Sequence, residues 1–149
     1  MKIKKAYTLL ELTVVLSIFS IVFLIFSNGI KAYKNFQNAI VVEQCSSSIM
    51  TFINSCKQYC YNNEVEGYIL CDQEKNRLSF YTGSSRKKVL KLPQGCKLQM
   101  VNTASGRQRL NFDSKGFTSD ACTIRYLDLK DLEHKITISV GTAYVEIKD

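Results

Sequence analysis

The segment Lys5-Ala-Tyr-Thr-Leu-Leu-Glu-Leu-Thr-Val-Val-Leu-Ser-Ile-Phe-Ser-Ile-Val-Phe-Leu-Ile-Phe26 decides the fold class of this 149-residue chain. Lys2, Lys4 and Lys5 form a basic head, and the residues from Tyr7 to Phe26 carry a single charge, on Glu11. A helix of about 20 apolar residues, rising about 1.5 Å per residue, is long enough to cross a bilayer. The segment therefore predicts a membrane helix at the N-terminus.

Glu11 is the unusual residue of this segment. A charged side chain costs about 2.5–3.5 kcal/mol at the bilayer centre and less near the interface, so an ionisable residue in such a segment usually has a function and a partner. The alternative is that the Glu11 side chain reaches back to the lipid headgroups.

The basic head also predicts the topology of the chain. By the positive-inside rule the head stays in the cytoplasm and everything after Phe26 lies outside the cell membrane. A cleaved secretory signal peptide has a similar head and core, and Ser27-Asn28-Gly29 offers small residues for a signal peptidase. A secreted or single-pass disulfide domain thus remains a distant alternative, although the length of the apolar run and Glu11 argue against it.

Residues Lys5-Ala-Tyr-Thr-Leu-Leu-Glu-Leu12 resemble the prepilin signal of type IV pilins and type II secretion pseudopilins. The resemblance implies cleavage by prepilin peptidase between Ala6 and Tyr7, followed by N-methylation of Tyr7. Glu11 of one subunit would then pair with the Tyr7 amine of its neighbour in the filament. Ala6 departs from the family pattern, because glycine is usual at that position.

The same resemblance implies a structural, non-enzymatic subunit without a cofactor. Its expected partners are other pilins or pseudopilins, prepilin peptidase, the inner-membrane assembly platform and, before assembly, the membrane itself. The filament would be periplasmic or extracellular and would serve DNA uptake, pilus biogenesis or type II-like secretion. Residues 1–6 would be the cleaved leader, and residues 7–29 the transmembrane and filament-core helix.

Residues 30–63 are predicted to continue the helix in amphipathic form. Apolar residues recur at helical spacing; they are Ile40, Val41, Cys45, Ile49, Phe52, Ile53, Cys56 and Cys60. The opposite face, expected to meet solvent, carries Lys34, Asn38, Glu43, Ser47, Asn54, Lys57 and Gln58. No proline interrupts the chain before Pro93, and the helix is expected to end near Tyr61.

Residues 64–149 are predicted to form a small antiparallel β domain, either one sheet or a small sandwich. Short runs rich in β-forming residues alternate with turn residues. The expected strands are 67–71, 77–82, 87–92, 96–101, 107–112, 122–127, 135–140 and 143–147. The predicted fold class is therefore α+β, with a long N-terminal helix packed on this domain.

The tail shows a second, weaker resemblance. Phe112-Asp-Ser-Lys-Gly116, Cys122-Thr-Ile124 and Ile136-Thr-Ile-Ser-Val-Gly-Thr-Ala-Tyr-Val-Glu-Ile147 are similar to the end of several minor subunits. These are the H-type pseudopilins, the FimT-like minor pilins and the Gram-positive competence pseudopilins.

The cysteines all lie beyond the apolar segment, at Cys45, Cys56, Cys60, Cys71, Cys96 and Cys122. An even number outside the cytoplasm favours disulfides. The alternative is that each is a small buried apolar residue. Three of them fall on the apolar helix stripe, facing whatever covers it, but the pairing stays open among fifteen connectivities.

The chain is basic, with a net charge of +7. Candidate DNA contacts are Arg86, Lys87, Lys88, Lys91, Arg107 and Arg109. If they share a face they could bind phosphates; the alternative is a solvated loop and a protected sheet edge. We find no catalytic, phosphate-binding or metal motif, and His134 is expected to be a solvated surface residue without a paired ligand.

Overall fold

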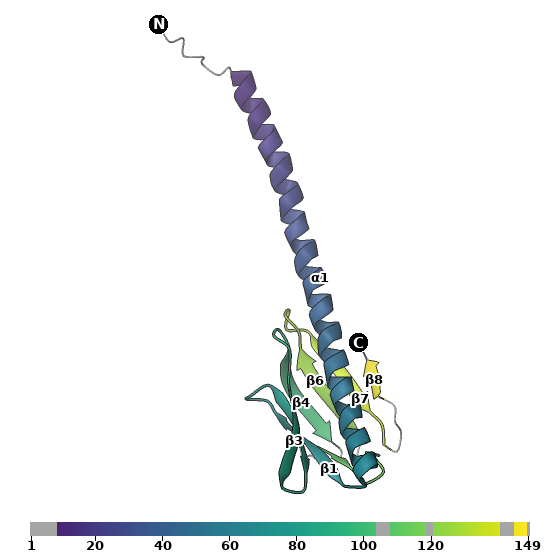
Figure 1. The fold of residues 1–149 in the computed structure, drawn as a ribbon. Helices are drawn as coiled ribbons and strands as arrows, with labels where there is room; N and C mark the ends of the chain where they lie inside the picture. Colours follow the sequence, from purple (N-terminus) through teal and green to yellow (C-terminus); the bar gives the residue numbers. More distant parts are fainter. Residues whose placement is uncertain (1–8, 104–107, 119–120, 141–144, 149) are drawn as a thin grey trace. The chain divides into compact units, whose positions relative to one another are not determined.

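The computed structural model describes residues 9–103, 108–118, 121–140 and 145–148. Within these residues the chain forms one helix followed by eight strands (Figure 1). They are α1 (Leu9–Asn63), β1 (Gly67–Asp72), β2 (Arg77–Thr82), β3 (Ser85–Lys91), β4 (Lys97–Thr103), β5 (Arg109–Phe112), β6 (Cys122–Leu127), β7 (Glu133–Ile138) and β8 (Val145–Lys148). The predicted helix and all eight predicted strands are confirmed, with small differences at their ends.

Helix α1 runs without a break through Asn28 and Gly29. It ends where Glu64 adopts a left-handed backbone conformation, with φ of 51°. The amide of Val65 then donates to the carbonyl of Cys60 at 3.1 Å, which closes the last turn. This bond satisfies one of the carbonyls that a helix end leaves without an intrahelical partner.

The chain divides into two units, Met1–Gln37 and Asn38–Asp149. In the first unit the apolar side chains from Leu9 to Phe26 are exposed. By length and composition this stretch of α1 could cross a membrane. In the second unit the remaining turns of α1 belong with the strands.

The strands form two four-stranded antiparallel sheets. One sheet has the order β3-β2-β1-β5, and the other has the order β4-β6-β7-β8. The sequence left open whether the strands form one sheet or a small sandwich. The structure has two sheets. The first sheet contains a register shift between Phe80 and Tyr81, so that Tyr81 pairs with Arg86 and Phe80 pairs with Lys88.

A single apolar core joins α1 to both sheets. From α1 it takes the helix stripe, which consists of Cys45, Ile49, Phe52, Ile53, Cys56 and Cys60. Opposite the stripe lie buried residues of both sheets, among them Phe80 and Leu110 from the first and Ile124 and Tyr126 from the second. The stripe is as predicted except at Ile40, which is exposed.

The predicted solvent face of α1 is wrong at two residues. Asn38 is buried because its side-chain amide donates to the carboxylate of Asp128 at 2.7 Å, 90 residues further along the chain. Lys57 is buried because the turn that carries Gly116 lies directly against its backbone carbonyl. Both residues lie at the border of the apolar stripe, where the packing partner decides which side chains are covered.

Candidate functional site

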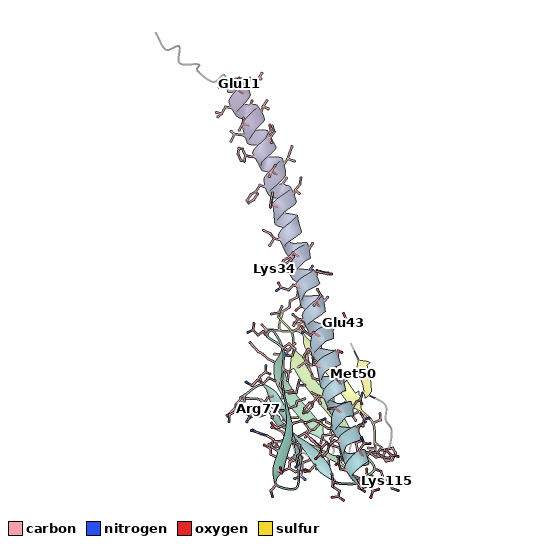
Figure 2. The ribbon with its side chains drawn as sticks, viewed as in Figure 1. Glu11, Lys34, Glu43, Met50, Arg77 and Lys115 are labelled. Atoms are coloured by element: carbon pink, nitrogen blue, oxygen red, sulfur yellow. The ribbon has the colours of Figure 1, made fainter. Side chains whose placement is uncertain are left out.

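The first candidate site is the exposed apolar part of α1. Figure 2 shows Glu11 at the beginning of the helix, in its first turn. Phe19, Phe23 and Phe26 have between 67% and 75% of their surface exposed, a degree that is unusual for large apolar residues in water. Apolar grooves between these side chains, lined by Leu16, Phe19, Val22, Phe23 and Phe26 among others, could receive side chains of another helix.

The hydroxyl groups in this part of α1 are hydrogen-bonded to the helix itself. Thr13 donates to the carbonyl of Leu10 at 2.9 Å, Ser17 donates to that of Thr13 at 2.8 Å, and Ser20 donates to that of Leu16 at 2.9 Å. These bonds satisfy the hydroxyl donors without water. The segment therefore suits an apolar surrounding, either lipid or packed helices.

Glu11 is placed favourably for a charge near a helix end. A carboxylate in the first turn interacts well with the positive end of the helix dipole. The predicted cleavage residues Ala6 and Tyr7 lie outside the described residues. Their roles, and the pairing of Glu11 with the Tyr7 amine, stay predictions.

The six cysteines are all buried. Two of them lie close together between α1 and the turn before β4, because the Cys96 thiol donates to the carbonyl of Val41 at 3.8 Å, one helical turn before Cys45. Burial raises the pKa of the Cys56 thiol to about 12 and also raises that of Cys60. Disulfide formation stays a prediction, and the buried positions fit either state of the thiols.

Part of the predicted basic cluster lies on one face of the first sheet. The cross-strand pairs of Tyr68 with Tyr81 and of Tyr81 with Arg86 place these residues on the same side. The guanidinium of Arg109 lies 3.7 Å from the ring centroid of Tyr68, whose other neighbour, Tyr81, is stacked at 5.3 Å. We call Tyr68, Tyr81, Arg86, Lys91 and Arg109 the basic aromatic face.

The basic aromatic face has a net positive charge. Arg77, which shares it, is paired with Asp72 at 3.1 Å, while Arg109 forms no ion pair with any described residue. Arg109 donates to the side-chain oxygen of Asn111 at 2.7 Å, which holds its guanidinium over the ring. Tyr68 and the stack were not predicted from the sequence, although strand alternation places Tyr68 opposite the buried Ile69.

Lys88 lies on the other side of the sheet. The register shift turns it toward α1, where its ammonium group donates to the carbonyl of Ser55 at 3.3 Å and lies 5.9 Å from the ring centroid of Tyr59. Lys88 is therefore left out of the basic aromatic face. Lys87 is exposed beside it, and Arg107 lies outside the described residues.

His134 is not a solvated surface residue, so that expectation is wrong. It lies in β7, its side chain is 19% exposed, and its Nε2 is 3.1 Å from a carboxylate oxygen of Asp128. Its ring also stacks on that of Tyr126 at 5.3 Å. Among the residues that the structure describes, no group of three or more His, Cys, Asp or Glu side chains could hold a metal ion.

Comparison with known proteins identifies the N-terminal segment and the fold. A family model described as the prokaryotic N-terminal methylation motif matches residues 1–27. The fold matches that of the minor pseudopilin EpsH from the type 2 secretion system of Vibrio cholerae, with a TM-score of 0.52 and 14% sequence identity. This match covers 70% of the chain and 96% of EpsH. The chain thus combines a prokaryotic N-terminal methylation motif with a pilin-like fold.

The chain is also similar to the type IV minor pilin FimU of Pseudomonas aeruginosa. This match has a TM-score of 0.49 and 13% identity, and it covers 72% of the chain and 90% of FimU. No curated protein sequence matches the chain significantly. The methylation motif, residues 1–27, includes the exposed apolar part of α1, and the strands of both sheets follow later in the chain.

Proposed function

We propose that the chain is a minor pilin or pseudopilin, a structural subunit of a type IV filament system. It is inserted in the membrane with its β domain outside the cytoplasm, cut between Ala6 and Tyr7 by prepilin peptidase, and methylated on Tyr7. The assembly platform then transfers it into a filament of pilins or pseudopilins, which serves DNA uptake, pilus biogenesis or type II-like secretion.

The observation that carries the proposal is the exposed apolar surface of α1, which has Glu11 in its first turn and lies within a methylation motif. Membrane lipid can cover this surface before assembly, and helices of neighbouring subunits can cover it afterwards. In the filament Glu11 neutralises the Tyr7 amine of a neighbour. An anchor for a single-pass domain has no comparable use for the carboxylate.

The processing step is tested by mass spectrometry of the chain purified from membranes of its host. We expect a mature N-terminus at methylated Tyr7. A mature chain that begins near Ile30 would show that an ordinary signal peptidase cuts it, and would overturn the proposal.

The assembly step is tested with Glu11→Gln, which removes the charge and preserves the shape. We expect normal membrane insertion and cleavage. Incorporation into filaments should fall by roughly tenfold or more, because an amine without its counter-charge costs about 2.5–3.5 kcal/mol in an apolar core. The matched control is Glu43→Gln, an exposed glutamate further along α1 (Figure 2). Equal incorporation of both variants would refute the pairing of Glu11.

The basic aromatic face supports a second function, DNA binding by the filament subunit. Arginine and stacked tyrosine side chains suit the phosphates and bases of single strands. The variant Arg86→Glu/Lys87→Glu should lower the slope of log affinity against log salt by about 1.5, since each phosphate contact adds about 0.7–0.9. The control is Lys115→Glu, on an exposed turn outside the basic aromatic face, and the measurement is fluorescence anisotropy with labelled oligonucleotides. Absence of binding by the wild-type chain at low salt would dismiss this function.

A further inference from the structure

The contact between α1 and the turn before β4 brings two buried cysteines together. Cys45 lies on the helix stripe and is fully buried, and Cys96 directly precedes β4 and is 2% exposed. The Cys96 thiol donates to the carbonyl of Val41 at 3.8 Å, one helical turn before Cys45. Helical side chains lean toward the N-terminus of their helix, so the Cys45 thiol lies over the turn that Cys96 contacts.

The turn that carries Cys96 is held firmly in this position. The carbonyl of Cys96 accepts a hydrogen bond from the side chain of Asn76 at 2.7 Å, and its amide donates to the carbonyl of Pro93 at 3.2 Å. Gly95 has a φ of 97°, and a Cβ atom there would lie 2.7 Å from the side chain of Leu129 and 3.2 Å from that of Val41 on α1. The turn therefore needs glycine for its backbone conformation and its close packing, and it presents Cys96 to Cys45.

We infer that Cys45 and Cys96 form a disulfide that ties α1 to β4 in the exported protein. The inference rests on the proposed function, because that function puts the domain outside the cytoplasm, where oxidants of thiols act. The bond would close a loop of about 50 residues and join the helix to the second sheet. A cross-link that closes a loop of that length strongly lowers the conformational entropy of the unfolded chain.

The two thiols of the pair differ in acidity in the folded domain. Interaction between them lowers the pKa of the Cys96 thiol and raises that of Cys45. Cys96 is therefore the more acidic thiol of the folded pair. In Cys56 and Cys71 burial raises the pKa of the thiol instead, which disfavours their thiolates.

The oxidant is a disulfide of an extracytoplasmic thiol oxidoreductase, which meets the chain before folding is complete. The thiolate of one cysteine attacks one sulfur of that disulfide and releases the other as a thiol. The other cysteine of the pair then loses its proton and attacks the sulfur of the first, which releases the second thiol of the oxidant. The domain loses two electrons and two protons, and the oxidant gains them.

The experiment maps the disulfides of the full chain purified from host membranes. Free thiols are first blocked with an alkylating reagent, and non-reduced peptides are then identified by mass spectrometry. We expect the Cys45 peptide linked to the Cys96 peptide. Reduction should lower the Tm by roughly 10 °C or more.

Two variants test whether the cross-link and its effect on the Tm depend on Cys45. Cys45→Ser should lose the cross-link and the sensitivity of its Tm to reduction. Cys56→Ser, at an equally buried position of the same helix stripe, should keep both. Alkylation of both Cys45 and Cys96 in the wild-type chain, or a cross-link of either one to another cysteine, would overturn the inference.

Identification of the N-terminal residue in the same sample distinguishes failure of the disulfide inference from failure of the proposed function. A chain that starts at methylated Tyr7 but has no Cys45–Cys96 bond refutes the disulfide alone. If the chain is not processed, the purified full chain in detergent is equilibrated with reduced and oxidised glutathione. Formation of the Cys45–Cys96 bond before any other then supports the inference, and any other first bond overturns it.

Discussion

Asp128 connects the beginning of the second unit to the loop between β6 and β7 through hydrogen bonds. Its carboxylate is almost completely buried, and it accepts bonds from the side chain of Asn38 and from the amides of Lys130 at 2.7 Å and Leu132 at 3.0 Å. His134 lies 3.1 Å away. Burial alone would raise the pKa of this carboxyl, but these hydrogen bonds outweigh burial and hold the pKa well below its usual range.

The depressed pKa of Asp128 predicts a stability that depends on pH. A carboxyl with a folded-state pKa below its unfolded value of about 3.9 stabilises the fold above that value, and the contribution is lost as the pH falls further. Asp128→Asn should reduce the free energy of unfolding at pH 7 by about 2–4 kcal/mol and weaken the acid dependence. Urea unfolding at several pH values measures both effects.

Asp131→Asn is the matched control for Asp128→Asn. It removes the same charge from the same loop, and asparagine tolerates the φ of 58° at that residue. Its stability should stay within about 0.5 kcal/mol of wild type. A similar loss in both variants would indicate that net charge, and not the hydrogen bonds of Asp128, causes the effect.

Lys57 is a buried residue whose charge weakens the fold. Its ammonium group has no hydrogen-bond partner among the described residues, and burial lowers the pKa of this lysine. The folded state is therefore destabilised below the folded pKa, and stability rises with pH toward about 10.4. Lys57→Met should raise the free energy of unfolding at pH 7 by about 1–3 kcal/mol.

The measurement for Lys57→Met is urea unfolding at pH 7 and at pH 10. The gain over wild type should shrink at the higher pH, because the wild-type lysine is then increasingly neutral in the fold. Lys115→Met, on an exposed turn, is the control and should change little. A loss of stability in Lys57→Met would refute this account.

At the scale of elements, the turn from Asp113 to Thr118 is pressed against α1. The Asp113 side chain accepts hydrogen bonds from the amides of Lys115 at 3.0 Å and Phe117 at 2.7 Å. Gly116 has a φ of 75°, and a Cβ atom there would lie 2.6 Å from the carbonyl oxygen of Lys57. The turn therefore needs glycine both for its conformation and for its contact with the helix.

Gly116→Ala should lower the free energy of unfolding by about 2–4 kcal/mol, since strain and a backbone clash add together. Gly83→Ala separates the two causes. Gly83 has a similar φ of 56° but open space around it, so only the conformational strain of about 1 kcal/mol remains. Thermal unfolding of both variants gives the comparison, and equal losses would show that the contact with α1 has no effect.

At the scale of the whole molecule, the core belongs entirely to one unit. Every residue of the buried apolar cluster lies between Cys45 and Ile138, within the unit Asn38–Asp149. The exposed apolar side chains of the first unit contribute nothing to that core. Stability of the β domain and insertion in membrane or filament are therefore properties of different parts of the chain.

A fragment of residues 38–149 should accordingly fold alone, as a soluble monomer with cooperative thermal unfolding. The full chain should require detergent. Size-exclusion chromatography and circular dichroism measure both properties. A fragment that aggregates or unfolds without a cooperative transition would show that the first unit is needed for folding.

The sequence by itself determined the elements of this protein and the character of its N-terminal segment. Helical and strand periodicity depend on local backbone geometry, so α1, the eight strands and the apolar helix stripe followed from residue spacing. The apolar run, the basic head and Glu11 are equally local; they predicted a membrane helix, and their resemblance to a prepilin signal implied the pilin-like fold.

Only the tertiary structure decided which side chains meet. Asn38 is buried by Asp128, 90 residues away, and a register shift between Phe80 and Tyr81 turns Lys88 toward α1 while Arg86 stays on the outer face. The choice of Cys96 as the neighbour of Cys45 likewise depends on how one turn packs on the helix. Such contacts join residues far apart in the chain, and local periodicity carries no information about them.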